Sequence, residues 1–256
     1  MTALITGASS GIGLELARIF ASNRHDVVLV ARTESKLREL ARECEASGVR
    51  AHVVPADLSQ AGAAQSIVDR VAALGLEIDV LVNNAGLGRY GLFIDLAPGS
   101  ELEMIQVNVV ALTELTRRCL PAMVARRRGR ILNVASTAAF LPGPLMAVYY
   151  ATKAYVLSFS EAIANELEGT GVTVTALCPG PTDSGFQAVA KLEDSKLEGK
   201  MLMTSRAAAQ AGYDAAMAGA VVHVPGLSNK LTALAPRFFP RVVMRRLVRR
   251  VQERRS

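Results

Sequence analysis

A tyrosine and a lysine four residues apart could together carry acid–base chemistry. Tyr149 and Lys153 lie within the segment YYATK, and residues four apart share one face of a helix. A tyrosine hydroxyl has an ordinary pKa of about 10, too high for a base at neutral pH, but a nearby ammonium favours the phenolate. The pair therefore predicts a group that gives and takes a proton. Tyr150 and Tyr155 have no such partner and are predicted to be packing residues.

Two further polar residues could belong to the same site. Ser136 follows the predicted strand 130–135, and ligands of α/β folds bind at the carboxyl ends of such strands. Its hydroxyl could stabilise negative charge on a carbonyl oxygen, although without Tyr149 a plain strand-end serine would be the preferred interpretation. Asn108 lies inside a predicted helix, where asparagine is unfavourable. This cost indicates a local role, such as holding a kink or a water.

The glycine-rich segment TGASSGIG, residues 6–13, predicts an anion-binding turn. Glycines let the chain turn sharply and let a pyrophosphate approach the backbone, while the following helix directs free N–H groups at the anion. The spacing is Gly-x3-Gly-x-Gly, and such a cluster alone is weak evidence. Its position between a predicted strand and a predicted helix strengthens it. The predicted contacts are Gly7, Ser9, Ser10, Gly11, Ile12 and Gly13.

The ends of the next two predicted strands bear on which dinucleotide would bind. Folds that prefer NAD usually place Asp or Glu at the end of the second strand, where this chain has Ala31 and Arg32. An arginine can bind a 2′-phosphate through paired N–H groups, so Arg32 favours NADP(H) over NAD(H). The alternative is that Arg32 is a solvated residue that opens the next helix. Asp57, followed by Leu58, could accept from the adenine amino group or cap the next helix, a role for which Ser59 competes.

Regular alternation of strands and helices would position these residues. The predicted strands are rich in Val, Ile and Leu at successive positions, which is typical of strands buried on both faces of a parallel sheet. We predict a single α/β domain with a doubly wound parallel sheet of about seven strands and helices on both faces. Strands are predicted at 3–6, 26–30, 50–54, 79–82, 130–135, 172–177 and 220–224, and helices at 12–22, 34–47, 61–73, 99–126, 148–168 and 206–217.

Finer details of this arrangement can also be predicted. Thr33, Ser59 and Ser205 each lie where a helix is predicted to begin. The loosely organised stretch 179–203 has the length of a lid or substrate loop.

Composition places the chain in a broad class. Its 256 residues suit one large domain, and half of them are apolar. No apolar run is long enough to span a membrane, and residues 1–13 do not resemble a signal peptide. Three widely spaced cysteines fit a reducing compartment and are expected to be small buried hydrophobes; they are Cys44, Cys119 and Cys178. We therefore expect a cytoplasmic protein.

The positive charge of the chain is concentrated in its last residues. From Arg237 onward there are eight arginines and one glutamate, a net of +7, which leaves −1 for the rest of a chain whose total is +6. This distribution argues against nucleic-acid binding, which usually needs a basic face on the folded body. The tail also has an apolar face, formed by Met244, Leu247, Val248 and Val251. The preferred interpretation is that this face packs on the body or on another subunit. The alternative is that it lies on an anionic membrane.

Together these residues resemble the short-chain dehydrogenase/reductase family. The matching motifs are TGASSGIG, Asp57, the segment NNAG at 83–86, the set Asn108, Ser136, Tyr149 and Lys153, and the turn Pro179-Gly180. The resemblance covers roughly residues 1–225, a predicted Rossmann-type catalytic domain, and leaves 226–256 as a basic amphipathic extension. Several motifs in register are highly specific. One departure is Tyr150, because the family more often has a small or polar residue after the tyrosine.

The resemblance implies an oxidoreductase that moves a hydride between NADP(H) and a carbonyl or alcohol. Tyr149 would be the acid in reduction and the base in oxidation, and Lys153 would bind the nicotinamide ribose and lower the tyrosine pKa. Ser136 would orient the carbonyl, and Asn108 would support a water chain. Asn84, Ala85, Gly86, Pro179, Gly180 and Thr182 would contact the cofactor. The family often forms dimers or tetramers, so a homo-oligomer is expected.

The substrate walls are expected at 87–93, at 137–146 and in the loop beyond Thr182. They are mostly apolar, with Arg89 the one cation: Leu87, Tyr90, Leu92, Phe93, Phe140, Leu141, Leu145, Met146 and Phe186. Such walls favour an apolar ketone, for example a 3-oxoacyl compound or a steroid, although the same residues could simply pack the domain. The competing hypothesis is a non-catalytic NADP-binding sensor or membrane-surface module, which would not need Ser136, Tyr149 and Lys153 together.

Overall fold

Seven parallel strands form one sheet in the computed structural model, which describes residues 1–185 and 202–253. The strand order is β3-β2-β1-β4-β5-β6-β9, so the predicted doubly wound sheet is confirmed, with every predicted strand present. Two further short strands pair with each other outside this sheet and were not predicted. The strands are β1 (Thr2–Thr6), β2 (Asp26–Ala31), β3 (Ala51–Pro55), β4 (Val80–Asn83), β5 (Gly129–Val134), β6 (Val172–Leu177), β7 (Thr182–Asp183), β8 (Met203–Thr204) and β9 (Val222–His223).

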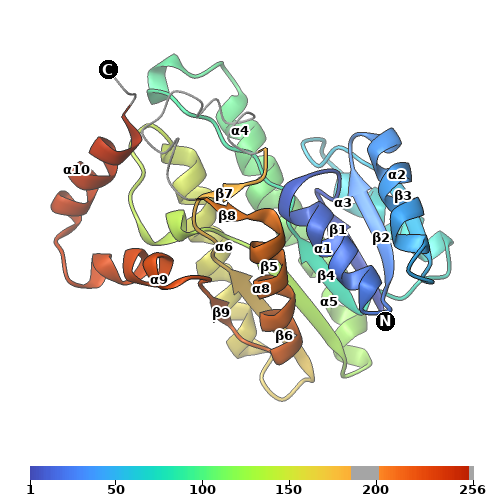
Figure 1. Cartoon of the computed structure of the whole chain (residues 1–256). Coiled ribbons are helices and arrows are strands. Elements are labelled where there is room, and N and C mark those ends of the chain that lie inside the picture. The colour runs from blue at the N-terminus through green and yellow to red at the C-terminus, as the bar shows by residue number, and fades with distance from the viewer. Residues whose placement is uncertain (186–201, 254–256) are drawn as a thin grey trace.

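Helices cover both faces of the sheet (Figure 1). Three of them, α1, α2 and α8, pack on one face, and α3, α4, α5 and α6 pack on the other. The helices are α1 (Gly11–Ser22), α2 (Glu34–Glu45), α3 (Ala63–Ala73), α4 (Ser100–Ile105), α5 (Leu112–Ala125), α6 (Ala147–Glu166), α8 (Ser205–Ala218), α9 (Leu227–Leu234) and α10 (Arg241–Gln252).

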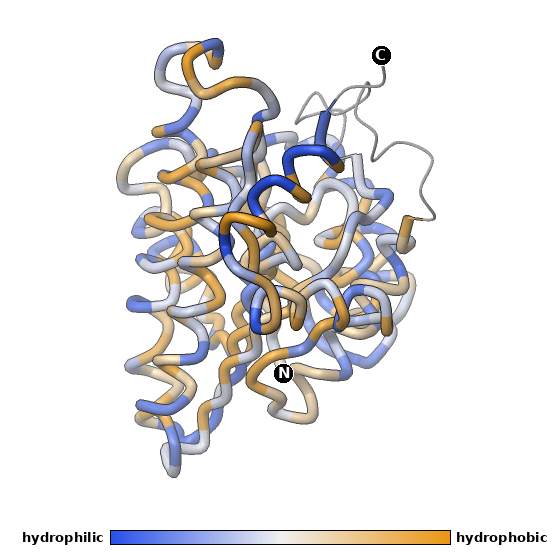
Figure 2. Tube along the Cα trace, turned by 90° about the vertical axis from the view of Figure 1, so that its left-hand side faces the viewer, coloured by the Kyte–Doolittle hydropathy of each residue, from blue (hydrophilic) through white to orange (hydrophobic). Residues whose placement is uncertain are grey.

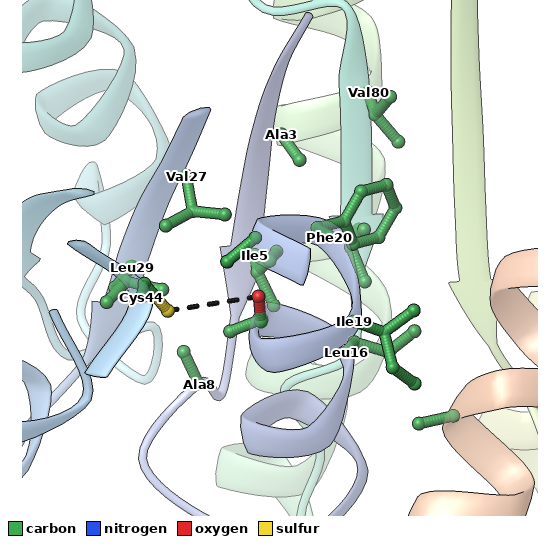
Figure 3. Packing of buried hydrophobic residues seen from close by; sticks show 14 of the residues in the cluster. Ala3, Ile5, Ala8, Leu16, Ile19, Phe20, Val27, Leu29, Cys44 and Val80 are labelled. Atoms are coloured by element: carbon green, nitrogen blue, oxygen red, sulfur yellow. Dashed lines mark hydrogen bonds between the residues drawn. The ribbon is translucent and has the colours of Figure 1, made fainter. Parts of the chain in front are cut away.

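The apolar strands follow from burial on both faces. Successive side chains of a strand point to opposite sides of the sheet. In β1, Ala3 and Ile5 join one apolar cluster and Leu4 joins the other, and all three are fully buried. Figure 3 shows the first cluster, in which Ile5 packs near Phe20 of α1. Because both faces are dry, every strand position needs an apolar side chain, which explains the continuous runs in the sequence.

The predicted helix 99–126 is correct in position but is not uniform. Its middle, the π-helical segment η2 (Gln106–Ala111), separates α4 from α5. A π turn adds one residue to the helical repeat and often marks a functional position. Asn108 lies in this turn, so the predicted kink at an unfavourable asparagine has a structural counterpart.

The structure confirms only part of the predicted helix starts. Helix α2 does begin after Thr33, but the threonine side chain makes no capping hydrogen bond. Helix α3 begins after Gly62, which has a positive φ of 79°, and not near Ser59. Thr204, rather than Ser205, caps α8 by accepting a hydrogen bond from the Ala207 N–H at 3.1 Å. Side-chain caps are local choices among neighbouring polar residues, which sequence spacing alone does not resolve.

All three cysteines are free and buried, as predicted. Burial raises the pKa of the Cys44 and Cys119 thiols to about 11 and that of Cys178 to about 12. Such thiols stay protonated and behave as small hydrophobes. Figure 3 shows Cys44 in the core beside α1.

The last part of the described chain forms an arm of α9, the short helix η4 (Ala235–Arg237) and α10. Met244 and Val248 of α10 are buried, so the preferred prediction of packing on the body holds for them. Leu247, from the same predicted apolar face, is 52% exposed. In the described part of the chain, no helix combines the length and the hydropathy that crossing a membrane would need.

Candidate active site

A cleft of about 660 Å³ lies at the carboxyl ends of the strands. The turns after β1, β2, β4, β5 and β6 all contribute to its wall, because parallel strands deliver their carboxyl ends to one edge of the sheet. The cleft is lined by every catalytic or cofactor residue expected from the sequence except Gly13 and Asn108, which lie just behind it. Segments far apart in the chain thus meet at one site.

The glycine turn between β1 and α1 is built for close approach of an anion. Gly7 and Gly11 have positive φ angles of 67° and 57°, which favour glycine. A side chain at Gly13 would overlap the Asn84 side chain and the Gly7 carbonyl, so this glycine allows helix packing rather than lining the cleft. The first turn of α1 has no acidic residue, and Ser10 makes no side-chain cap. The free N–H groups of α1 therefore remain open to an anion.

Thr6 locks the glycine turn to the loop after β4. Its hydroxyl accepts from the backbone N–H groups of Asn84 and Ala85 at 3.0 Å each and donates to the Val82 carbonyl at 3.1 Å. The Asn84 amide donates to the Thr6 carbonyl at 2.8 Å. Sequence reasoning missed this role of Thr6, although the threonine opens the glycine motif. The bonds hold the wall of Asn84, Ala85 and Gly86 in place.

Two cations line the far end of the cleft, where the strand β2 ends. Arg32 is exposed there, as expected, and Lys36 lies one turn further along on α2. No carboxylate in the described ranges forms an ion pair with either side chain. Sequence reasoning missed Lys36, which lies in the first turn of the helix that follows Arg32. Together they offer positive charge to a bound phosphate.

Asp57 lines the same end of the cleft and also holds its own turn. Its carboxylate accepts from the Ser59 N–H at 3.0 Å, so both sequence interpretations, cleft residue and local cap, describe part of its position. Burial alone would raise its pKa, but the hydrogen bonds from Ser59 and the charge of Arg32 hold the pKa below its ordinary value. Leu58 lies beside it on the cleft wall.

Ser136, Tyr149 and Lys153 all line the cleft. Tyr149 and Lys153 share a face of α6, and the lysine Nζ lies 5.8 Å from the centre of the tyrosine ring. Lys153 is buried and donates to the Val134 carbonyl at 2.7 Å. Ser136 hydrogen-bonds Tyr149 and is itself oriented by accepting from the Ala138 N–H at 3.1 Å. A proton donor, a second hydroxyl and an ammonium thus converge.

Burial shifts the pKa values of Tyr149 and Lys153 in opposite directions. Burial raises the pKa of Tyr149 to about 12, and the hydrogen bond with Ser136 offsets only part of the increase. Burial also lowers the pKa of Lys153 to about 8. Burial is the larger cause of the Tyr149 shift in the chain by itself, and the lowering of its pKa by Lys153 together with a cationic nicotinamide ring stays a prediction. At neutral pH the chain holds Tyr149 in its protonated form.

Asn108 lies directly behind the cleft and holds its wall. Its Oδ1 accepts from the Leu87 N–H at 2.8 Å, and its Nδ2 donates to the Leu87 carbonyl at 2.9 Å. The same amide nitrogen donates to the Thr152 hydroxyl at 3.0 Å. A side chain added at Gly86 would contact both Asn108 and Lys153 at 3.4 Å. Asn108 thus ties the π turn to Leu87 and to Thr152 of α6.

The turn after β6 closes the opposite wall. Pro179, Gly180 and Thr182 all line the cleft. Thr182 is buried, and its hydroxyl donates to the Gly180 carbonyl at 2.9 Å. The predicted lid at 179–203 lies mostly outside the described residues, but β7 and β8 pair at its two ends.

The substrate end is apolar, but its walls differ from the prediction. Among the predicted residues, Leu87 and Met146 line the cleft, whereas Leu92 and Phe93 are exposed and do not. Arg89 pairs with Glu103 at 3.1 Å instead of facing the cleft. Phe186 lies outside the described residues. Hydrophobicity alone could not separate cleft walls from exposed loop positions.

Tyr150 and Gln252 complete the substrate end, and neither was predicted there. The Gln252 amide donates to the Tyr150 hydroxyl, and the Tyr90 hydroxyl donates to the Gln252 carbonyl at 2.6 Å. Gln252 is only 1% exposed, and both it and Tyr150 line the cleft. Tyr150 also packs on Met146, so the packing interpretation was incomplete. Helix α10 thereby reaches the site.

Comparison with known proteins places the chain in a family. A family model described as short chain dehydrogenase matches residues 1–195. The chain belongs to the short-chain dehydrogenase family. It is 40% identical over 189 residues to a short chain dehydrogenase of Pseudocercospora fijiensis, which covers 73% of this chain and 61% of that relative. The chain thus spans less than two thirds of that relative's length.

Two other known proteins are also similar to the chain. The ketoacyl reductase HetN of Nostoc sp. is 35% identical over 199 residues, covering 77% of this chain and 69% of that protein. The solved structure of a short-chain dehydrogenase from Sphingobium yanoikuyae in complex with NADPH superposes with a TM-score of 0.83. It is 32% identical and covers 92% of both chains.

Proposed function

We propose that the protein is an NADP(H)-dependent oxidoreductase that interconverts an apolar ketone and its alcohol. One observation carries this proposal: Ser136, Tyr149 and Lys153 converge in a cleft whose far end presents a glycine turn and the cations Arg32 and Lys36. The cleft has room for a dinucleotide, and α1 directs free N–H groups at the pyrophosphate position. A pure binding module would not need the three polar groups together.

The proposed roles follow from this geometry. Tyr149, held protonated by burial, donates a proton to the carbonyl oxygen in reduction and accepts one in oxidation. Ser136 hydrogen-bonds the same oxygen. When bound, NADPH supplies the hydride. Lys153 would hold the nicotinamide ribose and Thr182 the carboxamide, while Asn108 holds Leu87 and would support a water path towards Lys153.

Cofactor preference provides the first test. Replacing Arg32 with alanine is expected to weaken NADPH binding by at least about tenfold, equivalent to about 1.4 kcal/mol, because paired N–H bonds to the 2′-phosphate are lost. NADH binding should change little. Fluorescence titration of both cofactors would measure this, and Arg42→Ala, an exposed arginine on α2 outside the cleft, is the matched control. Equal or tighter NADH binding by the parent protein would contradict the NADP(H) assignment.

The substrate is proposed to be an apolar ketone such as a 3-oxoacyl compound or a steroid. Leu87, Val107 and Met146 supply an apolar wall near Tyr149. The similar protein HetN is named a ketoacyl reductase, which agrees with such a substrate. A panel of 3-oxoacyl thioesters, steroid ketones and sugars, assayed with NADPH, would test the class. Sugar turnover above that of every apolar ketone would contradict it.

The contact between Tyr150 and Gln252 is expected to govern substrate affinity. Replacing Tyr150 with phenylalanine leaves the buried Gln252 amide without its hydrogen-bond acceptor. An unpaired donor at a buried site costs about 1–3 kcal/mol of free energy. We expect the KM for an apolar ketone to rise several-fold while kcat changes less than about threefold, because Tyr149 is untouched. Steady-state kinetics would show this split.

A matched control is available on the outer side of α6. Tyr155 also has one hydroxyl contact, to Thr113 at 2.9 Å, but does not line the cleft. Tyr155→Phe should leave KM unchanged. If both variants behave alike, Tyr150 has no special role at the substrate end.

We also propose that residues 1–225 form the catalytic domain, that 226–256 extend it, and that the chain forms a dimer or tetramer. A shallow apolar depression between the end of α4, the π turn and α6 supports self-association; it is lined by Ile105, Val109, Ala147, Val148, Ala151 and Thr152. Burying such a surface in a symmetric interface is favourable. A solution mass of a single chain by sedimentation would contradict the oligomer.

A further inference from the structure

The C-terminal arm, defined as residues 226–252, presents an unusual amount of apolar surface. It holds eight of the seventeen large hydrophobic side chains that are exposed in the described ranges. Phe238 is the most exposed of these eight, at 77%. The set is Leu227, Leu231, Leu234, Phe238, Phe239, Val242, Val243 and Leu247. Exposed apolar patches of this kind mark interaction surfaces.

The same arm carries only positive charge. No aspartate or glutamate occurs between Asp214 and Glu253, whereas seven cations do: Lys230, Arg237, Arg241, Arg245, Arg246, Arg249 and Arg250. Arg249 bonds Glu253 at 3.2 Å, and no other of these cations has an ion pair within the described ranges. Figure 2 looks onto this side of the molecule and shows hydrophobic and hydrophilic segments alternating along the arm.

The orientation of α10 keeps this surface free. Met244, Val248 and Gln252, spaced four apart, face the body and are buried. Val243 and Leu247 lie on another side of the helix and remain about half exposed, with arginines around them. The body therefore satisfies one face of α10 and leaves a mixed apolar and basic face uncovered.

We propose that this arm docks on an anionic lipid bilayer. The exposed Phe and Leu side chains would enter the interface between headgroups and acyl chains, while the arginines pair with lipid phosphates. A second copy of the arm would bring the same positive charge and be repelled. A nucleic acid would satisfy the arginines but not the leucines and phenylalanines. Only a negatively charged apolar surface matches both features.

Docking would also place the substrate end of the cleft near the bilayer. The arm ends in Gln252, which lines the cleft beside Tyr150. An apolar ketone dissolved in the membrane would then reach the cleft over a short path. The docking itself does not depend on the proposed reaction.

Vesicle binding tests the proposal without any turnover. The full chain is sedimented with vesicles of phosphatidylcholine alone or with about 30 mol % phosphatidylserine. We expect binding only to the anionic vesicles, weakened by salt. Replacing the Arg245–Arg246 pair with glutamines should weaken vesicle binding about thirtyfold, because each arginine near an anionic surface contributes about 1 kcal/mol to the binding free energy. Replacing Phe238 and Phe239 with serines should also weaken it on the same vesicles.

Matched pairs elsewhere on the surface serve as controls. Arg117 and Arg118 are adjacent exposed arginines on α5, and Phe93 and Ile94 are adjacent exposed apolar residues. Glutamine and serine replacements at these pairs should leave vesicle binding unchanged. The proposal is overturned by absent binding to anionic vesicles at low salt, or by equal losses in the control pairs. It is also overturned if, without lipid, the Phe238→Ser/Phe239→Ser variant dissociates an oligomer, since the patch would then be a subunit contact.

Discussion

Replacing Tyr149 with phenylalanine is expected to lower kcat/KM for ketone reduction by about a thousandfold. The substitution removes only the hydroxyl, and a positioned acid of this kind contributes about a hundredfold to ten-thousandfold. The buried ring that packs with Met146 stays in place, so the fold and NADPH affinity should be retained. Stopped-flow or steady-state assays with NADPH would measure the loss, and a titration would confirm that cofactor binding is kept.

The control for this substitution is Tyr155→Phe, which removes a hydroxyl outside the cleft. It should leave the rate unchanged within about twofold. Retention of more than about a tenth of the activity by the Tyr149 variant would rule the tyrosine out as the proton donor. Cofactor binding by the parent chain without turnover of any ketone would instead favour a sensor.

The pH dependence of reduction should follow Lys153 rather than Tyr149. Because burial raises the pKa of Tyr149 to about 12 in the free chain, its proton remains in place at pH 6–9. Lys153, with a pKa lowered to about 8 by burial, loses its charge as the pH rises through that value. The plot of kcat/KM for the free enzyme should therefore be flat near neutrality and fall above a pH of about 8.

Replacing Lys153 with methionine is expected to stabilise the fold while abolishing most of the activity. The pKa of this lysine falls from 10.5 to about 8 on folding, which corresponds to about 3 kcal/mol lost by burying the ammonium. Methionine removes this penalty but also the hydrogen bond to the Val134 carbonyl. We therefore expect the free energy of unfolding at pH 7 to rise by about 1–3 kcal/mol.

Because the stability effect depends on the charge of Lys153, it can be tested by measuring stability at different pH values. Below the folded-state pKa of about 8, the lysine is charged in both states and the penalty is fully present. Between about 8 and 10.5 the folded state has lost the proton that the unfolded state still binds, so the parent protein gains stability as the pH rises. The advantage of the methionine variant should shrink over this range in urea unfolding at pH 7 and pH 10. A gain independent of pH, or none, would contradict the buried charge.

A role in the proposed chemistry would explain why a charged residue lies at this buried position. The buried ammonium is unfavourable for folding, yet its Nζ lies 5.8 Å from the centre of the Tyr149 ring. Functional sites commonly break a packing rule of this kind. The buried position of Lys153 against the core strand β5 is thus itself an indication of function.

The sequence by itself determined the class of fold and most of the lining of the cleft. Continuous apolar runs can be satisfied only by strands covered on both faces, and parallel strands send their carboxyl ends to one edge. Residues that follow those strands, such as Asp57, Asn84, Ser136 and Thr182, must therefore gather there. Glycine spacing and the spacing of four between Tyr149 and Lys153 are local patterns that need no tertiary information.

The tertiary structure alone decided the contacts between distant segments and the chemical state of the site. Gln252 meets Tyr150 across 102 residues of sequence, and no local pattern encodes that meeting. Leu92 and Phe93 are as apolar as Leu87, yet only Leu87 lines the cleft, since position rather than hydropathy selects a wall. The opposite pKa shifts of Tyr149 and Lys153 arise from desolvation, which depends on everything packed around a group and not on its neighbours in the chain.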